Sequence, residues 1–319
     1  MFEPLFRVVK NGKIGFIDRA GKIVIAPESD PPVPDYGCDD FKEGLARIEV
    51  ETEEKGLLGV GNKKKIGFID TTGKVVIPPQ FDSANSFHDG LALVQVNYKN
   101  GFIDKTGRMV VPAQWDVAHD FSDGLALVTS GGKDGFIDKT GKVVIVPQFD
   151  GASPFSEGLA AVFIERKPAY IDKTGQVVLR PEVEDAIGFS EGLAAVAVGG
   201  KWGFIDKTGQ IVIKPEYISA SRFSNGMARF RVDGKWGFID RTGRKVIEPQ
   251  YDFADDFSEG LATVQIGRRW GYIDTTGQLM IKPQFNHASS FCESLARVTT
   301  DEGDGYIDKT GKYVWPPSR

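Results

Sequence analysis

The chain has 319 residues, of which 41% are hydrophobic and 26% are charged, a composition typical of a packed globular protein. Its formal net charge of -5 argues against bulk nucleic-acid binding, and no apolar run approaches the length that a membrane span needs. We therefore expect no nucleic-acid partner and no membrane insertion. The first residues, Met1 to Arg7, lack the basic and apolar segments of a secretory signal, which predicts a cytoplasmic location.

A short segment, Gly-(Phe/Tyr)-Ile-Asp, recurs along the whole chain. It begins at residues 15, 67, 101, 135, 203, 237, 271 and 305, with a degenerate copy at Ala169, and the spacing is 34 residues from residue 67 onward. A fixed period is the signature of a repeat array, in which each unit packs on its neighbours. We predict a single array over residues 1–319, with nine units that start near residues 5, 45, 91, 125, 159, 193, 227, 261 and 295.

The first unit departs from this period. The interval from Gly15 to Gly67 is 52 residues, which leaves a surplus of 18. Six residues enter within 27–37, and twelve lengthen the next hairpin within 51–65. Glutamates such as Glu49 and Glu51 stand on one arm of this hairpin and Lys63 to Lys65 on the other, so opposite charges are predicted to face each other on a projecting hairpin.

Each unit is predicted to form a meander of three antiparallel strands, which we name A, B and C. In the unit that starts at 227, strand A spans 227–232, strand B 236–239 and strand C 245–247. Asp233-Gly234 is a two-residue hairpin turn, and 240–243 (Asp-Arg-Thr-Gly) is a second turn in which Asp240 bonds back to the backbone. Pro249 ends strand C because proline cannot donate to a ladder.

The return segment between units, seen at residues 80–90, is also patterned. Asp82 is a plausible N-cap for one helical turn, from which Ala84 and Phe87 face inward, and Gly90 supplies the positive φ that ends it. We interpret the phenylalanine as a plug that seals neighbouring units together. It recurs as Phe41, Phe121, Phe155, Phe189, Phe223, Phe257 and Phe291.

The fold class predicted is all-β, with nine meanders stacked into an open, curved β-superhelix or solenoid. A closed, nine-bladed, propeller-like ring is the alternative. Propellers usually have four to eight four-stranded blades of about 40 to 50 residues, whereas these units are shorter and no strand is divided between the termini.

The repeated pattern resembles the WG (or KWG) repeat family. It reads Gly-Lys-Trp-Gly-Phe-Ile-Asp-Lys-Thr-Gly at 200–209, Val-Ile-x-Pro-x-Tyr-Asp at 246–252 and Phe-Ser-x-Gly-Leu-Ala at 257–262. The resemblance covers essentially the whole chain. It implies a repeat scaffold with an interaction role, of a kind found mainly in bacterial proteins, and it carries no catalytic residues across. The tryptophan departs from the pattern in six units, as Ile14, Ile66, Asn100, Asp134, Pro168 and Asp304.

Catalytic chemistry finds little support in the sequence. The repeated aspartates, from Asp18 to Asp308, stand in Asp-x-(Thr/Ala)-Gly and lack the alternating carboxylates of a calcium loop, so a turn role explains them. His88, His119 and His287 occupy three different offsets in the repeat. Cys38 and Cys292 are far apart in the array, so no intramolecular disulfide is expected. We predict that the protein is not an enzyme and has no cofactor or metal ion.

The better candidate site is the tryptophan position. Trp202, Trp236 and Trp270 stand there in three successive units, so they are predicted to form a row along one face. Arg231 faces Trp236 across the hairpin and Arg229 shares its side, which predicts a cation–π contact. Residues 201–250 hold ten Lys or Arg and five Asp or Glu, a net charge of +5, so the rest of the chain carries -10. The alternative is that the tryptophans only cap the hairpin ends.

Two functions follow from these features. The first is a non-enzymatic scaffold that binds another protein through the Trp202–Trp270 face or the inserted hairpin. The second is a glycan-binding module in which sugar rings stack on the same tryptophans. An enzyme is the third choice, because no cluster of polar residues converges in the repeat pattern.

Overall fold

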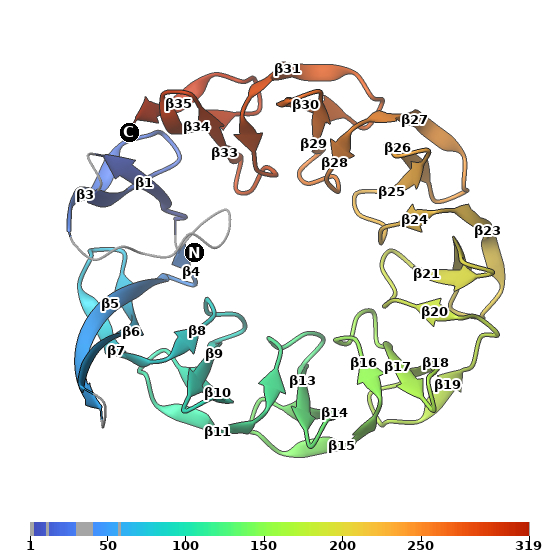
Figure 1. Ribbon diagram of the computed structural model, residues 1–319, viewed down its shortest axis with the longest axis horizontal. Helices are drawn as coiled ribbons and strands as arrows, with labels where there is room; N and C mark the ends of the chain where they lie inside the picture. Colours follow the sequence, from blue (N-terminus) through green and yellow to red (C-terminus); the bar gives the residue numbers. More distant parts are fainter. Residues whose placement is uncertain (1–2, 11–12, 30–40, 57–58, 319) are drawn as a thin grey trace.

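A computed structural model describes residues 3–10, 13–29, 41–56 and 59–318, which form nine small antiparallel sheets around a central opening (Figure 1). We call each sheet a blade and number the blades 1 to 9 in chain order. The described residues contain no helix, and hence none that could cross a membrane. The prediction of an all-β repeat array is confirmed.

Each blade runs outward from the opening in chain order. The inner strands are β4 (Phe41–Lys42), β8 (Ser83–Ala84), β12 (Val117–Ala118), β16 (Gly151–Ala152), β20 (Asp185–Ala186), β24 (Ser219–Ala220), β28 (Phe253–Ala254) and β32 (His287–Ala288). Strands A are β1 (Phe6–Lys10), β5 (Leu45–Gly56), β9 (Leu91–Val96), β13 (Leu125–Ser130), β17 (Ala160–Ile164), β21 (Leu193–Val198), β25 (Met227–Val232), β29 (Leu261–Ile266) and β33 (Leu295–Thr300).

Strands B and C complete the blades. Strands B are β2 (Lys13–Ile17), β6 (Gly59–Asp70), β10 (Lys99–Asp104), β14 (Lys133–Asp138), β18 (Lys167–Ile171), β22 (Lys201–Asp206), β26 (Lys235–Asp240), β30 (Arg269–Asp274) and β34 (Gly303–Asp308). Strands C, on the rim, are β3 (Ile23–Ser29), β7 (Val75–Phe81), β11 (Met109–Trp115), β15 (Val143–Phe149), β19 (Val177–Leu179), β23 (Ile211–Tyr217), β27 (Lys245–Tyr251), β31 (Leu279–Phe285) and β35 (Tyr313–Ser318).

The predicted turns are confirmed. Asp233 and Gly234 have φ angles of 47° and 81°, as a tight hairpin between β25 and β26 requires. In the turn after β26, the Asp240 carboxylate accepts hydrogen bonds from the backbone N–H groups of Thr242 and Arg244, at 3.0 and 3.1 Å. The repeated aspartates therefore hold turns together.

The predicted helical turn in the return segment is wrong. Ser83–Ala84 forms an inner strand that pairs with β9, so the blades from 2 onward have four strands rather than three. Asp82 is not an N-cap. Its carboxylate accepts from the Asn97 N–H at 2.7 Å and pairs with Lys65 at 2.7 Å, and so braces the hairpin turns beside it. Gly90 has the predicted positive φ, 84°.

The glycine of the repeated Gly-(Phe/Tyr)-Ile-Asp segment lies where strand C crosses strand B closely. A Cβ on Gly203 would lie 2.5 Å from the Ile213 carbonyl oxygen and 2.6 Å from the Pro215 nitrogen, distances that no real Cβ tolerates. Blade 5 carries Ala169 instead. There strand C is only Val177–Leu179, shorter than the seven-residue strands of its neighbours. The glycine thus lets strand C bulge over strand B.

The predicted phenylalanine plugs are buried and join successive blades. Phe155 and Phe189 are 0% and 1% exposed. Each plug packs against the aromatic side chain of strand B in the preceding blade, as Phe136 does with Phe155 at a ring-centroid distance of 4.7 Å. The same contact recurs in the pairs Phe16–Phe41, Phe68–Phe87, Phe102–Phe121, Tyr170–Phe189, Phe204–Phe223, Phe238–Phe257 and Tyr272–Phe291.

The open superhelix is contradicted, because blade 1 packs against blade 9 and closes the ring. Phe6 stands where the other eight units have alanine, and its ring lies 5.6 Å from Tyr306 of blade 9. It therefore fills the space that a plug fills elsewhere. Arg19 of blade 1 pairs with Glu293 of blade 9, and Gly21 lies against Val314. The closed, nine-bladed ring, which was the alternative, is the fold observed.

The insertions in the first two units are only partly described. Strands β5 and β6 pair as far as Gly56 and Gly59, which confirms the lengthened hairpin, and Figure 1 shows it projecting from the rim. Lys64 pairs with Glu49 at 2.5 Å, as the facing charges predict. The insertion within 27–37 lies mostly outside the described residues.

The expectation of no intramolecular disulfide is wrong, because Cys292 is disulfide-bonded in the structure. The chain has one other cysteine, Cys38, which lies outside the described residues.

We predict that Gly203→Ala destabilises the protein by about 1–3 kcal/mol, the usual cost of overpacking, because its Cβ collides with backbone rather than with a mobile side chain. Ala169→Gly is the matched control and is expected to change stability by less than about 1 kcal/mol. Denaturant unfolding followed by circular dichroism measures both. Equal effects of the two substitutions would show that the close approach of strand C is unimportant.

Candidate functional site

The three predicted tryptophans take equivalent positions near the start of strand B. Trp202 lies on β22, Trp236 on β26 and Trp270 on β30, and all three side chains are half-buried against the apolar clusters between blades. Their bodies contribute to the packing of neighbouring blades while one part of each ring stays accessible. The structural role that was the alternative interpretation of the sequence is thus present, and the binding role stays a prediction.

Aromatic rings form a continuous row on blades 7 to 9, which we call the aromatic row and define as Trp236, Phe253, Trp270 and His287. The ring centroids of Trp236 and Phe253 are 6.3 Å apart. Phe253 and Trp270 are 5.3 Å apart, and so are Trp270 and His287. Such spacings are typical of attractive aromatic pairs. Two of the three tryptophans, Trp236 and Trp270, are thus connected through the ring of Phe253.

Phe253 and His287 were missed as members of this row. They occupy the first position of an inner strand, which carries no aromatic side chain in five other units: Ser83, Val117, Gly151, Asp185 and Ser219. The aromatic residue at this position was the feature of the sequence that could have identified Phe253 and His287 as members of the row. Ser219 stands between Trp202 and Trp236, so the row begins at Trp236.

Arg231 and Arg229 flank Trp236 as predicted, with different surroundings. Arg231 pairs with Trp236 in the ladder and its guanidinium lies 5.7 Å from the ring centroid, which confirms the cation–π geometry. Arg231 is exposed. The Arg229 guanidinium lies 5.2 Å from the same ring but is partly buried between blades, where it pairs with Asp256 at 3.0 Å and Asp255 at 3.4 Å. Arg229 therefore positions the row, and Arg231 is the accessible cation.

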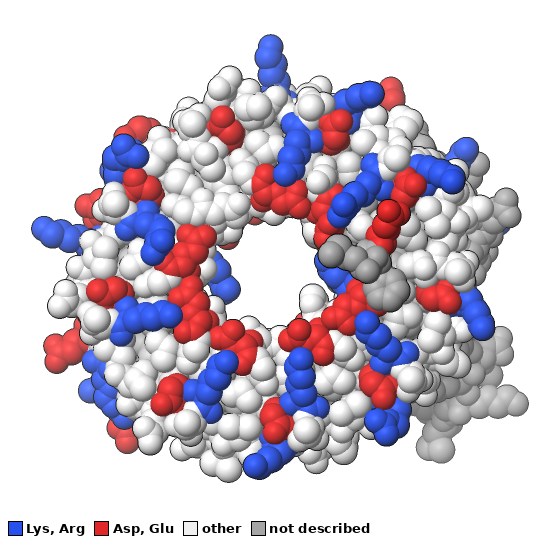
Figure 2. Space-filling model, turned by 180° about the vertical axis from the view of Figure 1, so that it is seen from behind, with Lys and Arg blue, Asp and Glu red and all other residues white. Residues whose placement is uncertain are grey.

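Carboxylates gather around the mouth of the central opening on the face seen in Figure 2. The turns that precede strands A carry an acidic residue in most blades, and Glu157 represents them. Its carboxylate accepts from the Gly192 N–H of the next blade at 3.1 Å and pairs with Lys207 at 3.1 Å. Burial raises the pKa of Glu157, but the Lys207 and Gly192 hydrogen bonds outweigh it and hold the pKa below its usual value. These acids connect blades.

The same contacts recur around the opening and across the seam of the ring. Glu43 is bound by Gly90 and Lys105, and Glu259 by Ser294 and Lys309. Arg19 takes the place of these lysines in its pairing with Glu293. Among the described residues, no group of three or more His, Cys, Asp or Glu is arranged to hold a metal ion.

Nine repeated antiparallel sheets around an axial opening define a nine-bladed β-propeller. The chain belongs to the WG containing repeat family, whose repeat matches residues 14–51, 66–99, 101–133, 135–167, 169–202, 202–236, 236–269 and 270–302. The resemblance inferred from the Gly-Lys-Trp-Gly segments is thereby confirmed. No curated protein matches the chain.

Solved structures similar to this chain are distant. Hsv2p of Kluyveromyces lactis is 11% identical with a TM-score of 0.41, and the match covers 60% of this chain and 73% of that one. The extracellular domain of the putative hybrid two component system BT4673 of B. thetaiotaomicron is 10% identical with a TM-score of 0.42, over 99% of this chain and 54% of that one. PorZ of Porphyromonas gingivalis, a component of the type-IX secretion system, is 12% identical with a TM-score of 0.35. The match covers 100% of this chain and 52% of that one.

We predict that the protein loses stability in acid. Hydrogen bonds from Thr208 hold the pKa of Asp206 below the ordinary value of an aspartate, and the contacts with Lys207 and Gly192 hold the pKa of Glu157 below that of an ordinary glutamate. Groups with a depressed folded pKa stabilise the protein above their unfolded pKa and lose that contribution as the pH falls. The melting temperature is therefore expected to fall as the pH is lowered from about 5 to 3. A melting temperature that stays constant over that range would contradict this assignment.

Proposed function

We propose that this protein is a non-enzymatic scaffold that binds another protein through the aromatic row and Arg231. The observation that carries the proposal is the unbroken series of ring contacts from Trp236 to His287. Tryptophan and arginine are the residues most enriched among those that dominate protein interfaces.

The chemistry of the row favours an acidic segment as its partner. Arg231 presents an exposed guanidinium over Trp236. Trp236 is the member of the row that lies within residues 201–250, which carry a net charge of +5 in a chain whose net charge is -5, so the basic character belongs to the blade 7 end of the row. Long-range attraction of an acidic partner would raise the association rate, and the rings would supply apolar contact area. An extended segment that follows the row would meet Trp236 on blade 7, Phe253 and Trp270 on blade 8, and His287 on blade 9.

The compartment in which this binding takes place is part of the proposal. Disulfides persist mainly in oxidising environments, and Cys292 is disulfide-bonded. This favours a location outside the cytoplasm, whereas the sequence predicted a cytoplasmic one. The cytoplasmic location that the sequence predicted is the alternative.

Replacing Trp236 and Trp270 together by alanine tests the proposed surface. We expect the double variant to lose partners that the unaltered protein captures in a quantitative pull-down, because two rings and the support for Arg231 are removed. Trp202→Ala is the matched control, since Trp202 occupies the same position on a blade outside the row. The unfolding midpoint of each variant checks that the closed ring of blades is still folded.

Two outcomes would contradict the proposal. Equal capture by the double variant and by Trp202→Ala would remove the row from the interface. Loss of partners on deletion of residues 53–62, with no effect of the double variant, would place the interface on the projecting hairpin. A glycan array probed with the same proteins tests the alternative function, and binding of sugars that is lost only in the double variant would favour it.

A further inference from the structure

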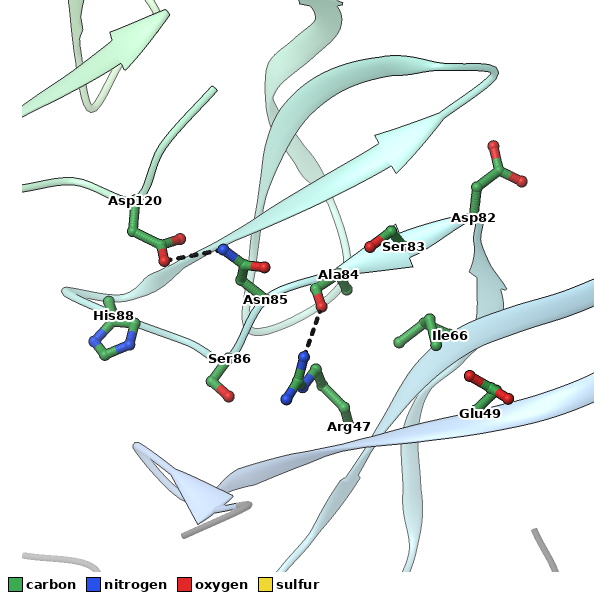
Figure 3. Close-up of a pocket in the computed structure, with 10 residues that line it drawn as sticks. All are labelled: Arg47, Glu49, Ile66, Asp82, Ser83, Ala84, Asn85, Ser86, His88 and Asp120. Carbon is green, nitrogen blue, oxygen red and sulfur yellow. Dashed lines mark hydrogen bonds between the residues drawn. The ribbon is translucent and has the colours of Figure 1, made fainter. Parts of the chain in front are cut away.

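A cavity of about 460 Å³ lies between blades 2 and 3, far around the ring from the aromatic row. Figure 3 shows that its lining comes from β5, β6 and the return segment that leads into blade 3, with Asp120 contributed by the next return segment. This volume falls within the range of small-molecule sites, about 300–1,000 Å³. The proposed function does not account for it.

The cavity lies where two positions that hold rings in the clefts of blades 7 to 9 carry no ring. The equivalent cleft between blades 7 and 8 contains Trp236 and Phe253, whose rings are 6.3 Å apart. In blades 2 and 3 the same positions of the repeat are Ile66 and Ser83, and both line the cavity. The cleft between blades 7 and 8 is thus the same cleft of the repeat with its space occupied by two aromatic rings.

The polar groups around Arg47 differ from those around its counterpart in the filled cleft. Arg47 is 9% exposed, and its Nη1 donates to the Ala84 carbonyl oxygen at 3.0 Å, as Arg229 does to Ala254. Arg229 also meets two carboxylates, Asp255 and Asp256. The corresponding positions beside Arg47 are Asn85 and Ser86, which are neutral and can both donate and accept hydrogen bonds.

The carboxylates that line the cavity are balanced by their own partners. Glu49 pairs with Lys64 at 2.5 Å. Asp82 pairs with Lys65 at 2.7 Å. Asp120 accepts from the Asn85 Nδ2 at 3.0 Å, a contact that Figure 3 shows at the far wall. Among the described residues, Arg47, Lys64 and Lys65 carry three positive charges against the three carboxylates, so the described part of the wall has no net charge and offers both donors and acceptors.

We propose that this cavity binds a neutral, polyhydroxylated molecule of about monosaccharide size. Each hydroxyl group both donates and accepts, so a polyol satisfies a wall of mixed donors and acceptors that an anion or a cation meets only in part. A buried donor left without an acceptor is costly, which gives such a site selectivity for hydroxyl groups. The proposal is independent of the aromatic row.

Saturation-transfer NMR with the unaltered protein tests this site directly. The probes are D-glucose, D-galactose, D-mannose and myo-inositol, with D-glucuronate and D-glucosamine as charged counterparts. We expect at least one neutral probe to bind more tightly than either charged one. Ser83→Phe, which copies Phe253 into this cleft, should weaken that binding at least tenfold, and Ile66→Trp should do the same.

Ser219→Phe is the matched control, because it makes the same substitution at the same repeat position of blade 7. We expect it to leave the binding unchanged. The proposal is overturned if none of the neutral probes binds, if glucuronate or glucosamine binds best, or if Ser83→Phe has no more effect than Ser219→Phe. Binding that is lost in the Trp236 and Trp270 variant but kept in Ser83→Phe would place the sugar on the aromatic row and also overturn it.

Discussion

The contact between the aromatic side chain on strand B of one blade and the plug of the next is the interaction on which the ring depends. It recurs with ring centroids 4.7 to 4.9 Å apart from Phe16–Phe41 to Tyr272–Phe291. A single 34-residue meander cannot bury both of its faces, so each blade is stable only between neighbours. Phe6 extends the rule to the seam, where its ring lies against Tyr306 of blade 9. The acidic turns around the opening add a second, polar set of the same cyclic contacts.

Much of this fold could be predicted because it is local. The two-residue turn at Asp233-Gly234, the aspartate turns and the buried plugs depend on residues close in sequence, and the period repeats each signal. The closure could not be read in the same way, because it depends on the sum of small rotations between blades. One residue did indicate closure: Phe6 replaces the alanine that all eight other units have at this position of strand A. Asp82 was misinterpreted because its partners, Lys65 and the Asn97 N–H, lie 17 and 15 residues away.

The candidate sites show how one repeated cleft acquires different surfaces. The tryptophan position and the first residue of the inner strand face the same cleft between blades. Two rings there produce the aromatic row, and Ile66 with Ser83 leaves a cavity. The sequence indicated the variable tryptophan but not its partner position, because the return segment was expected to be a helical turn rather than a strand. The pairing of β28 with β29 brings Phe253 beside Trp270.

Small-angle X-ray scattering of the full chain tests the central claim, ring closure, most directly. A closed nine-bladed ring predicts the pair-distance distribution of a compact disc with a central opening, unchanged on dilution. An elongated particle, with a long tail in that distribution, would contradict closure and restore the open superhelix.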